Sequence, residues 1–132
     1  MRKHNFVSLI LFILYLAALA WCCFGNFDDL PKVQKSFFGI ATDKVVHFIM
    51  FFPFPILCFQ SFSFAVRKQR TAFLATILVF FLGCLVAAGT EIGQSYTSYR
   101  SGDPMDFGAD VLSMAISSVL CLICYLIYRK KS

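Results

Sequence analysis

The chain has 132 residues, of which 59% are hydrophobic and only 14% are charged, and its formal net charge is +5. Soluble globular domains are about 45–50% apolar and about 25% charged, so a chain with a mean hydropathy of +0.75 needs a bilayer to solvate its surface. At about 20 residues per membrane-spanning helix, four spans take up most of the length. The residues that remain are too few for a separate soluble catalytic or nucleotide-binding domain.

Four stretches are nearly free of charge and long enough to cross a membrane as helices. They are, in chain order, residues 5–25, 45–66, 71–94 and 104–128. The length of the first favours a retained anchor over a cleaved signal peptide. Pro53 and Pro55 predict a bend in the second. We therefore expect an all-α integral membrane protein, a single domain over residues 1–132 that forms a four-helix transmembrane bundle.

The basic residues predict the orientation of this bundle. Eight of the twelve lie before the first span, between the second and third, or after the fourth. They are Arg2, Lys3, Arg67, Lys68, Arg70, Arg129, Lys130 and Lys131. The positive-inside rule places them in the cytoplasm, so we expect cytoplasmic termini in a multi-pass protein of the inner cell membrane. The net charge then reflects topology and contact with the lipid bilayer, and we expect no nucleic-acid partner.

Polar residues gather where three of the spans meet the opposite, outer surface. Each span contributes a pair of residues three or four positions apart, and such a pair shares one helix face. The pairs are Asp43 with His47, Glu91 with Gln94, and Asp106 with Asp110, and Arg100 lies in the loop between the last two pairs. Charged groups within a span are costly unless they are paired or functional. We therefore expect these seven residues to line one outward-facing binding site.

Some of these residues also have simpler interpretations. Asp43 and Asp103 lie at helix starts, where a carboxylate caps free amides, and we favour that role for Asp103. Both roles stay open for Asp43, because His47 lies one turn further along the same face. Glu91 and Asp110 cannot both ionise cheaply side by side unless a proton, a cation or the loop arginine intervenes. A purely structural polar network is the alternative for the whole set.

Small residues predict where the last two spans touch. Gly89 and Gly93 flank Glu91, and Ser113 and Ser117 follow on the last span. Small side chains allow the backbones of two membrane helices to approach closely. We therefore expect the third and fourth spans to pack against each other beside Glu91.

Three motifs in the chain resemble those of the VanZ-like family, small integral membrane proteins associated with teicoplanin resistance. Residues 43–48 (DKVVHF) resemble the first motif, residues 91–94 (EIGQ) the second, and Arg100 followed by Asp106 the third. The resemblance covers nearly the whole chain and implies four helices in the same order. The family usually has Asn where Asp110 stands. The site that the resemblance implies consists of Asp43, His47, Glu91, Gln94, Arg100 and Asp106.

Two functions fit these expectations. The first is a non-enzymatic envelope protein that binds an amphipathic ligand, namely a lipid headgroup, a cell-wall precursor or a lipoglycopeptide such as teicoplanin, and so contributes to glycopeptide resistance. Arg100 and Lys44 would be available for a phosphate or carboxylate group. The second is a membrane-embedded, metal-assisted hydrolase or transferase that acts on a lipid-linked substrate, with His47 or Glu91 as the catalytic base.

The candidate cofactor for the second function is a divalent cation. Carboxylate ligands favour Mg²⁺, Mn²⁺ or Ca²⁺, and the imidazole of His47 would also admit Zn²⁺. The sequence does not choose between these metals. Of the two functions, we favour ligand binding, with catalysis as the alternative. Ion or proton translocation is disfavoured because the ionisable residues stop near one surface.

Overall fold

The computed structural model describes residues 3–26, 36–63, 66, 68–98 and 102–131. Within these residues, five α-helices and one short hairpin follow one another. They are α1 (Lys3–Phe24), β1 (Ser36–Phe37), β2 (Ile40–Ala41), α2 (Thr42–Phe51), α3 (Pro53–Phe62), α4 (Gln69–Ser95) and α5 (Pro104–Lys131). With α2 and α3 taken as one segment, four helical segments are long and apolar enough to cross a membrane. The expected all-α class is confirmed at this level.

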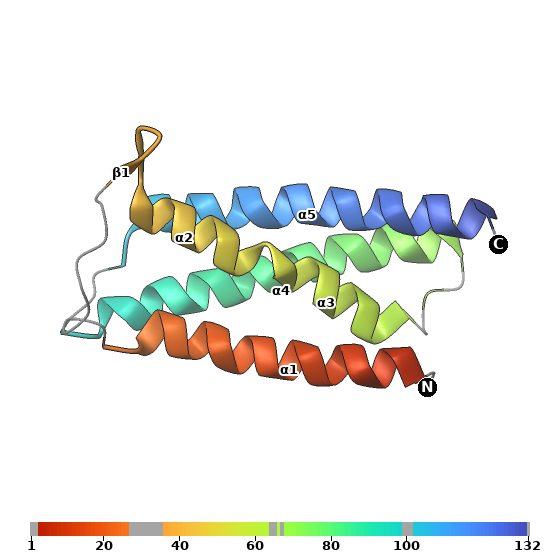
Figure 1. Ribbon diagram of the computed structural model, residues 1–132, viewed down its shortest axis with the longest axis horizontal. Helices are drawn as coiled ribbons and strands as arrows, with labels where there is room; N and C mark the ends of the chain where they lie inside the picture. Colours follow the sequence, from red (N-terminus) through yellow and green to blue (C-terminus); the bar gives the residue numbers. More distant parts are fainter. Residues whose placement is uncertain (1–2, 27–35, 64–65, 67, 99–101, 132) are drawn as a thin grey trace.

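The helices form an elongated bundle whose two ends differ (Figure 1). The first residue of α1 and the last of α5 lie at one end, which we call the terminal end. The hairpin, the start of α2, the last turn of α4 and the start of α5 lie at the other, the hairpin end. Along the bundle, α4 packs against α5, α1 against α3, and α2 against α5. This arrangement brings the polar ends of three helices into one region.

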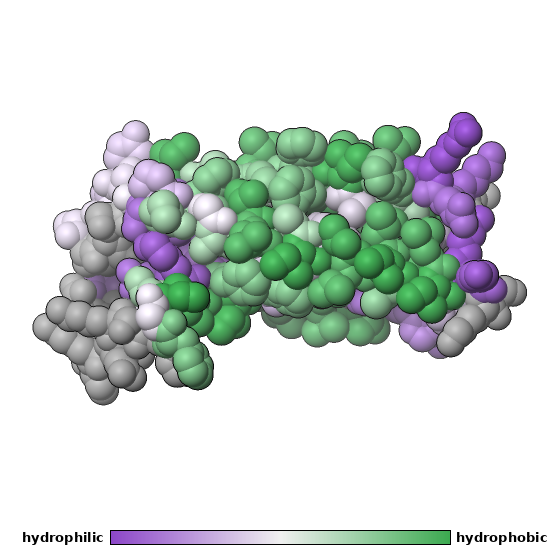
Figure 2. Space-filling model, turned by 90° about the horizontal axis from the view of Figure 1, so that it is seen from above, coloured by the Kyte–Doolittle hydropathy of each residue, from purple (hydrophilic) through white to green (hydrophobic). Residues whose placement is uncertain are grey.

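The middle of the bundle has a predominantly hydrophobic surface. Figure 2 shows an apolar band between hydrophilic residues at the two ends. Large apolar side chains are exposed in the middle of the helices, among them Leu14 (60%), Leu78 (69%) and Leu85 (71%). Exposed apolar surface of this extent is unfavourable in water and suits contact with lipid.

The second predicted span is interrupted close to its middle. Helix α2 ends at Phe51 and α3 begins at Pro53, which has no backbone N–H to continue the hydrogen-bond ladder. Side chains of two neighbouring helices donate to carbonyl groups near this bend: Ser113 of α5 to Phe48, and Tyr15 of α1 to Met50. The predicted bend is therefore present, and hydrogen bonds from both flanking helices hold it in place.

A short hairpin precedes α2 where the sequence predicts only a polar connection. Ser36 pairs with Ala41 and Phe37 with Ile40 in an antiparallel register. The two turn residues, Phe38 and Gly39, have φ angles of 51° and 78°. Positive φ at both central positions is typical of a tight hairpin turn. The hairpin delivers the chain directly into the first turn of α2.

Helices α4 and α5 pack together as expected, but the predicted glycine contacts are wrong. A Cβ atom on Gly89 would meet nothing within 4 Å, and one on Gly93 would meet Phe24 of α1. The close approach to α5 is instead made by Gly83, where a Cβ atom would lie 2.4 Å from the sulfur of Met114 and 3.0 Å from Phe54. The sequence identifies small residues, but not the helix that each of them faces.

This difference predicts opposite effects for two glycine substitutions in α4. Gly83→Ala should destabilise the bundle by about 1–3 kcal/mol, because the new methyl group overpacks a filled core. Gly89→Ala, the matched control, should be neutral or stabilising by up to about 1 kcal/mol, because it adds only helix propensity. Thermal unfolding in detergent, followed by circular dichroism, measures both. Equal stability of the two variants would contradict the packing described.

Candidate functional site

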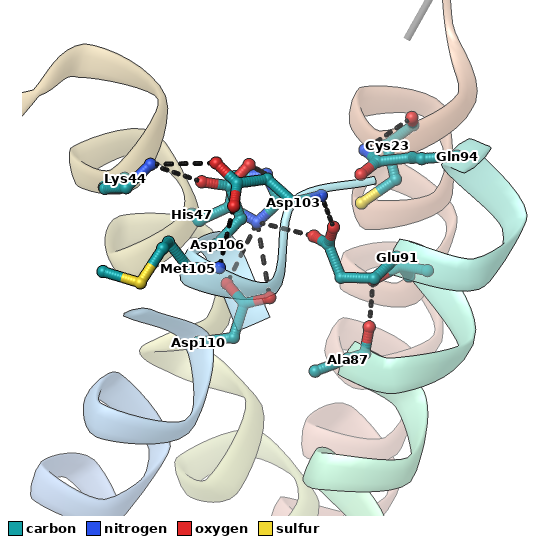
Figure 3. Close-up of polar contacts among 11 residues, drawn as sticks. Cys23, Lys44, His47, Ala87, Glu91, Gln94, Asp103, Met105, Asp106 and Asp110 are labelled. Carbon is teal, nitrogen blue, oxygen red and sulfur yellow. Dashed lines mark hydrogen bonds and ion pairs between the residues drawn. The ribbon is translucent and has the colours of Figure 1, made fainter. Parts of the chain in front are cut away.

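His47 lies at the centre of a polar cluster at the hairpin end of the bundle (Figure 3). Its Nδ1 atom is 3.1 Å from Oδ1 and 3.3 Å from Oδ2 of Asp110. His47 is only 4% exposed and Asp110 is completely buried. This contact joins the first turns of α2 to the second turn of α5.

Two further carboxylates approach the same imidazole ring from two helices. Glu91 of α4 places Oε1 3.6 Å from Nδ1 of His47, and Asp106 of α5 places Oδ2 3.6 Å from Nε2. Both acidic residues are buried. One ligand atom from each of His47, Glu91 and Asp106 lies within 4.8 Å of the other two. Residues 15 to 59 positions apart in sequence thus meet in a space of the size of one small ion.

Lys44 and Asp103 form the rim of the cluster. The Nζ atom of Lys44 lies 3.2 Å from Oδ2 of Asp103 and 3.3 Å from Oδ1 of Asp106. Asp103 also caps α5, as expected, because its Oδ1 accepts a hydrogen bond from the backbone N–H of Met105. Its own backbone N–H donates to Oε2 of Glu91 at 2.9 Å. The loop before α5 is therefore attached to both α2 and α4.

These contacts affect the ionisation of Asp103. The backbone N–H of Met105 and the ammonium group of Lys44 both favour the carboxylate, and they lower the pKa of Asp103 below its ordinary value. Asp103 is therefore charged at neutral pH, and it holds Lys44 at the rim of the cluster.

Two of the predicted site residues, Gln94 and Asp43, are not brought into this cluster. Gln94 is buried, and its Nε2 donates to the carbonyl oxygen of Cys23 at 2.9 Å, so it links α4 to α1. Asp43 is exposed and forms neither an ion pair nor a hydrogen bond with another described residue. Arg100 lies outside the described residues, and its role stays a prediction.

The cluster contains more acid than base among the residues that the structure describes. Its acids are Glu91, Asp103, Asp106 and Asp110, and its bases are Lys44 and, when protonated, His47. Moreover, Oε1 of Glu91 is buried without a hydrogen-bond donor from any described residue. Unpaired charge is expensive away from water, so protons or a bound cation must neutralise the excess.

Two features of this cluster have no counterpart in the predicted site. Lys44 was expected to be available for a ligand, and the structure pairs it with the acids of the rim. Its position three residues before His47 is the signal that could have indicated a shared face. The backbone N–H of Asp103, which donates to Glu91, carries no sequence signal because every residue except proline has this group.

The terminal end of the bundle has a different character. A cavity of about 890 Å³ there is lined partly by Asn5, Gln60 and Tyr125, and one of about 760 Å³ is lined partly by Arg70 and Arg129. The acidic residues that the structure describes are Asp43, Glu91, Asp103, Asp106 and Asp110, and none of them lines either cavity. The acidic cluster therefore lies at one end of the bundle and basic groups lie at the other, and both ends are hydrophilic in Figure 2.

Comparisons with known proteins leave the function of this site open. No family model matches the sequence, and no solved structure matches it. The chain is 29% identical over 123 residues, which are 93% of its length, to "uncharacterized protein C11E3.10" of Schizosaccharomyces pombe. It spans 65% of the length of that relative. The chain therefore has a partial likeness to one larger protein, whose printed name carries no activity.

The contact between His47 and Asp110 predicts a strong coupling between these residues. His47→Ala should destabilise the fold by about 3–5 kcal/mol, because it leaves a buried carboxylate without its partner. Adding Asp110→Asn should recover part of this loss, because the amide carries no charge. Unfolding of these variants in detergent and EDTA measures the differences in stability. Asp43→Asn is the exposed control and should be neutral. Equal stability of His47→Ala and the double variant would disprove the coupling.

The lowered pKa of Asp103 predicts a pH-dependent contribution to stability. A carboxyl group whose pKa is lower in the folded state than in the unfolded state stabilises the fold at pH values above the unfolded-state pKa. This contribution is lost as the pH falls through the folded-state pKa. Asp103→Asn keeps a capping side chain but removes the charge. Wild type should therefore unfold at a higher temperature than the variant at pH 7, with the gap closing toward pH 3. A gap that stays constant over this range would contradict the assignment.

Proposed function

We propose that this chain is a VanZ-like, multi-pass protein of the inner cell membrane that binds the polar headgroup of an amphipathic ligand at its hairpin end. The hairpin end faces outward in this proposal, and both termini face the cytoplasm. The ligand class is that of an envelope lipid, a lipid-linked cell-wall precursor or a lipoglycopeptide. One observation carries the proposal: His47, Glu91 and Asp106, one residue from each of the three motifs, meet at one end of four span-length helical segments.

The segregation of charge supports this orientation. The terminal end carries Lys3, Lys68, Arg70, Arg129 and Lys130, while the acidic cluster lies at the other end. The positive-inside rule places basic flanks in the cytoplasm. The acidic cluster would then face the compartment in which envelope precursors and external antibiotics are found.

The surface beside the cluster supports an amphipathic ligand rather than a fully polar one. Val46, Ile92 and Met105 are each next in sequence to a cluster residue, and their exposed fractions are 45%, 60% and 66%. A ligand held by its headgroup would therefore find apolar surface next to the polar site. Lys44, whose side chain is 25% exposed, provides the cationic group at the rim for a phosphate or carboxylate.

Binding of a polyprenyl phosphate by purified protein tests this proposal, with phosphatidylcholine as the reference lipid. The wild type should prefer the phosphate lipid in native mass spectrometry or thermophoresis in detergent. Lys44→Gln should weaken its binding at least tenfold, whereas Lys44→Arg should retain it. The matched control is Lys68→Gln, which removes the same charge at the terminal end and should bind normally.

Two outcomes would contradict the proposal. The first is a wild-type protein that binds the phosphate lipid no more tightly than phosphatidylcholine. The second is an equal loss of binding in Lys44→Gln and Lys68→Gln, because attraction by net charge alone would then explain the preference. Melting temperatures of all variants confirm that the folds compared are the same.

A second candidate function is metal-assisted hydrolysis or group transfer on the same lipid-linked ligand. The contact between His47 and Asp110 favours it, because a carboxylate on one ring nitrogen orients an imidazole and increases its basicity. Turnover of a lipid-linked phosphate ester by the wild type, abolished in His47→Gln, would distinguish catalysis from binding alone.

A further inference from the structure

Three side chains at the centre of the cluster are arranged like the ligands of a metal ion. Metal–ligand bonds of about 2.0–2.2 Å allow two ligand atoms to lie up to about 4.4 Å apart. The ligand atoms of His47, Glu91 and Asp106 already lie within 4.8 Å of one another. Adjustments of a few tenths of an ångström, which side-chain torsions provide, would therefore close the site. We propose that these three residues bind one divalent metal ion.

An independent observation at Glu91 points to the same ion. One oxygen of its carboxylate, Oε2, accepts the backbone N–H of Asp103. The other, Oε1, is buried without a hydrogen-bond donor among the described residues and points toward His47 (Figure 3). A buried carboxylate oxygen without a donor is costly. A cation between Glu91, His47 and Asp106 supplies the missing partner.

Asp110 completes this arrangement as a positioning residue. In the tautomer that carries its proton on Nδ1, His47 donates to Oδ1 of Asp110 at 3.1 Å, and the lone pair of Nε2 is left on the side of Asp106. Histidine ligands of metals usually donate their second ring N–H to a carboxylate in this way, which fixes both tautomer and ring orientation. The carboxylate at position 110 therefore orients His47 for the metal.

The charge of the cluster sets the class of the ion. Four carboxylates face Lys44 and one histidine, which is neutral when it binds a metal, so a dication removes most of the excess negative charge. One imidazole and two carboxylates suit Mn²⁺ or Zn²⁺ better than Ca²⁺, which takes six to eight oxygen ligands.

This inference deepens the proposed function and rests on it only for the role of the ion. A metal at the cluster would present its open coordination positions to the phosphate of a headgroup and would offset the acidity that otherwise repels such a group. The ion itself binds whether or not a lipid does. The two claims therefore fail separately.

Titration of purified, EDTA-treated protein with Mn²⁺, followed by electron paramagnetic resonance, tests the site directly. We expect one saturable Mn²⁺ per chain, displaced by Zn²⁺, and a rise in melting temperature on binding. Nitrogen coupling in the electron spin echo modulation of the bound ion should report the imidazole of His47. This last readout uses the wild type alone, so it does not depend on whether any variant folds.

Four substitutions locate the ion within the cluster. Glu91→Gln and His47→Gln should each weaken Mn²⁺ binding at least 100-fold, and the second should abolish the nitrogen coupling. Asp110→Asn should weaken binding about 10–100-fold, the usual effect of losing the carboxylate partner of a histidine ligand. Asp43→Asn, a carboxylate in the same first turns of α2 but outside the cluster, is the matched control and should bind as the wild type does.

Three results would overturn the metal site: no saturable Mn²⁺ or Zn²⁺ binding by the wild type, bound Mn²⁺ without nitrogen coupling, or an equal loss of affinity in Asp43→Asn and Glu91→Gln. If the wild type binds no metal but still binds the phosphate lipid in EDTA, the metal site is disproved and the proposed function is supported. If the wild type binds the metal but does not prefer the phosphate lipid, the metal site is supported and the proposed function is disproved.

Discussion

Neutralising buried carboxylates is the constraint on which the hairpin end of the bundle depends. Helices apolar enough for a bilayer cannot carry isolated charges cheaply, yet Asp110 is completely buried and Glu91 and Asp106 are nearly so. His47 lies within 3.6 Å of all three acids, which come from two other helices. The imidazole therefore fixes the start of α2 against α4 and α5, and the bend at Pro53 lets the rest of the segment follow α1.

Much of the fold could be predicted from hydropathy, because each uncharged stretch of sufficient length has to satisfy its backbone groups internally as a helix. Details that depend on neighbours could not. The spacing of small residues marks a face of α4, but only the rotation of the helix decides that Gly93 meets Phe24 and Gly83 meets Met114. The hairpin was missed because Phe38 is not a residue that usually takes a positive φ.

The centre of the site was predictable for a similar reason. Ionisable residues within apolar segments are stable in few environments, so His47, Glu91, Asp106 and Asp110 were expected to lie together. The structure places them together. Asp43 and Lys44 lie four and three residues before His47, and spacing alone permits either to share its face. The structure selects Lys44, because acids already surround the histidine and a cation is the partner that they lack.

Solid-state NMR of the protein in lipid bilayers tests the convergence of these helices most directly. With ¹⁵N-labelled histidine and aspartate labelled at the carboxyl carbon, dipolar dephasing should connect one imidazole to a carboxyl group, because Nδ1 of His47 lies 3.1 and 3.3 Å from the two oxygens of Asp110. The dephasing of Nδ1 should fall sharply in Asp110→Asn, whereas that of Nε2, which lies 3.6 Å from Oδ2 of Asp106, should remain. If neither the His4 nor the His47 imidazole signal is dephased in the wild type, α2 and α5 do not meet, and the proposed site has no basis.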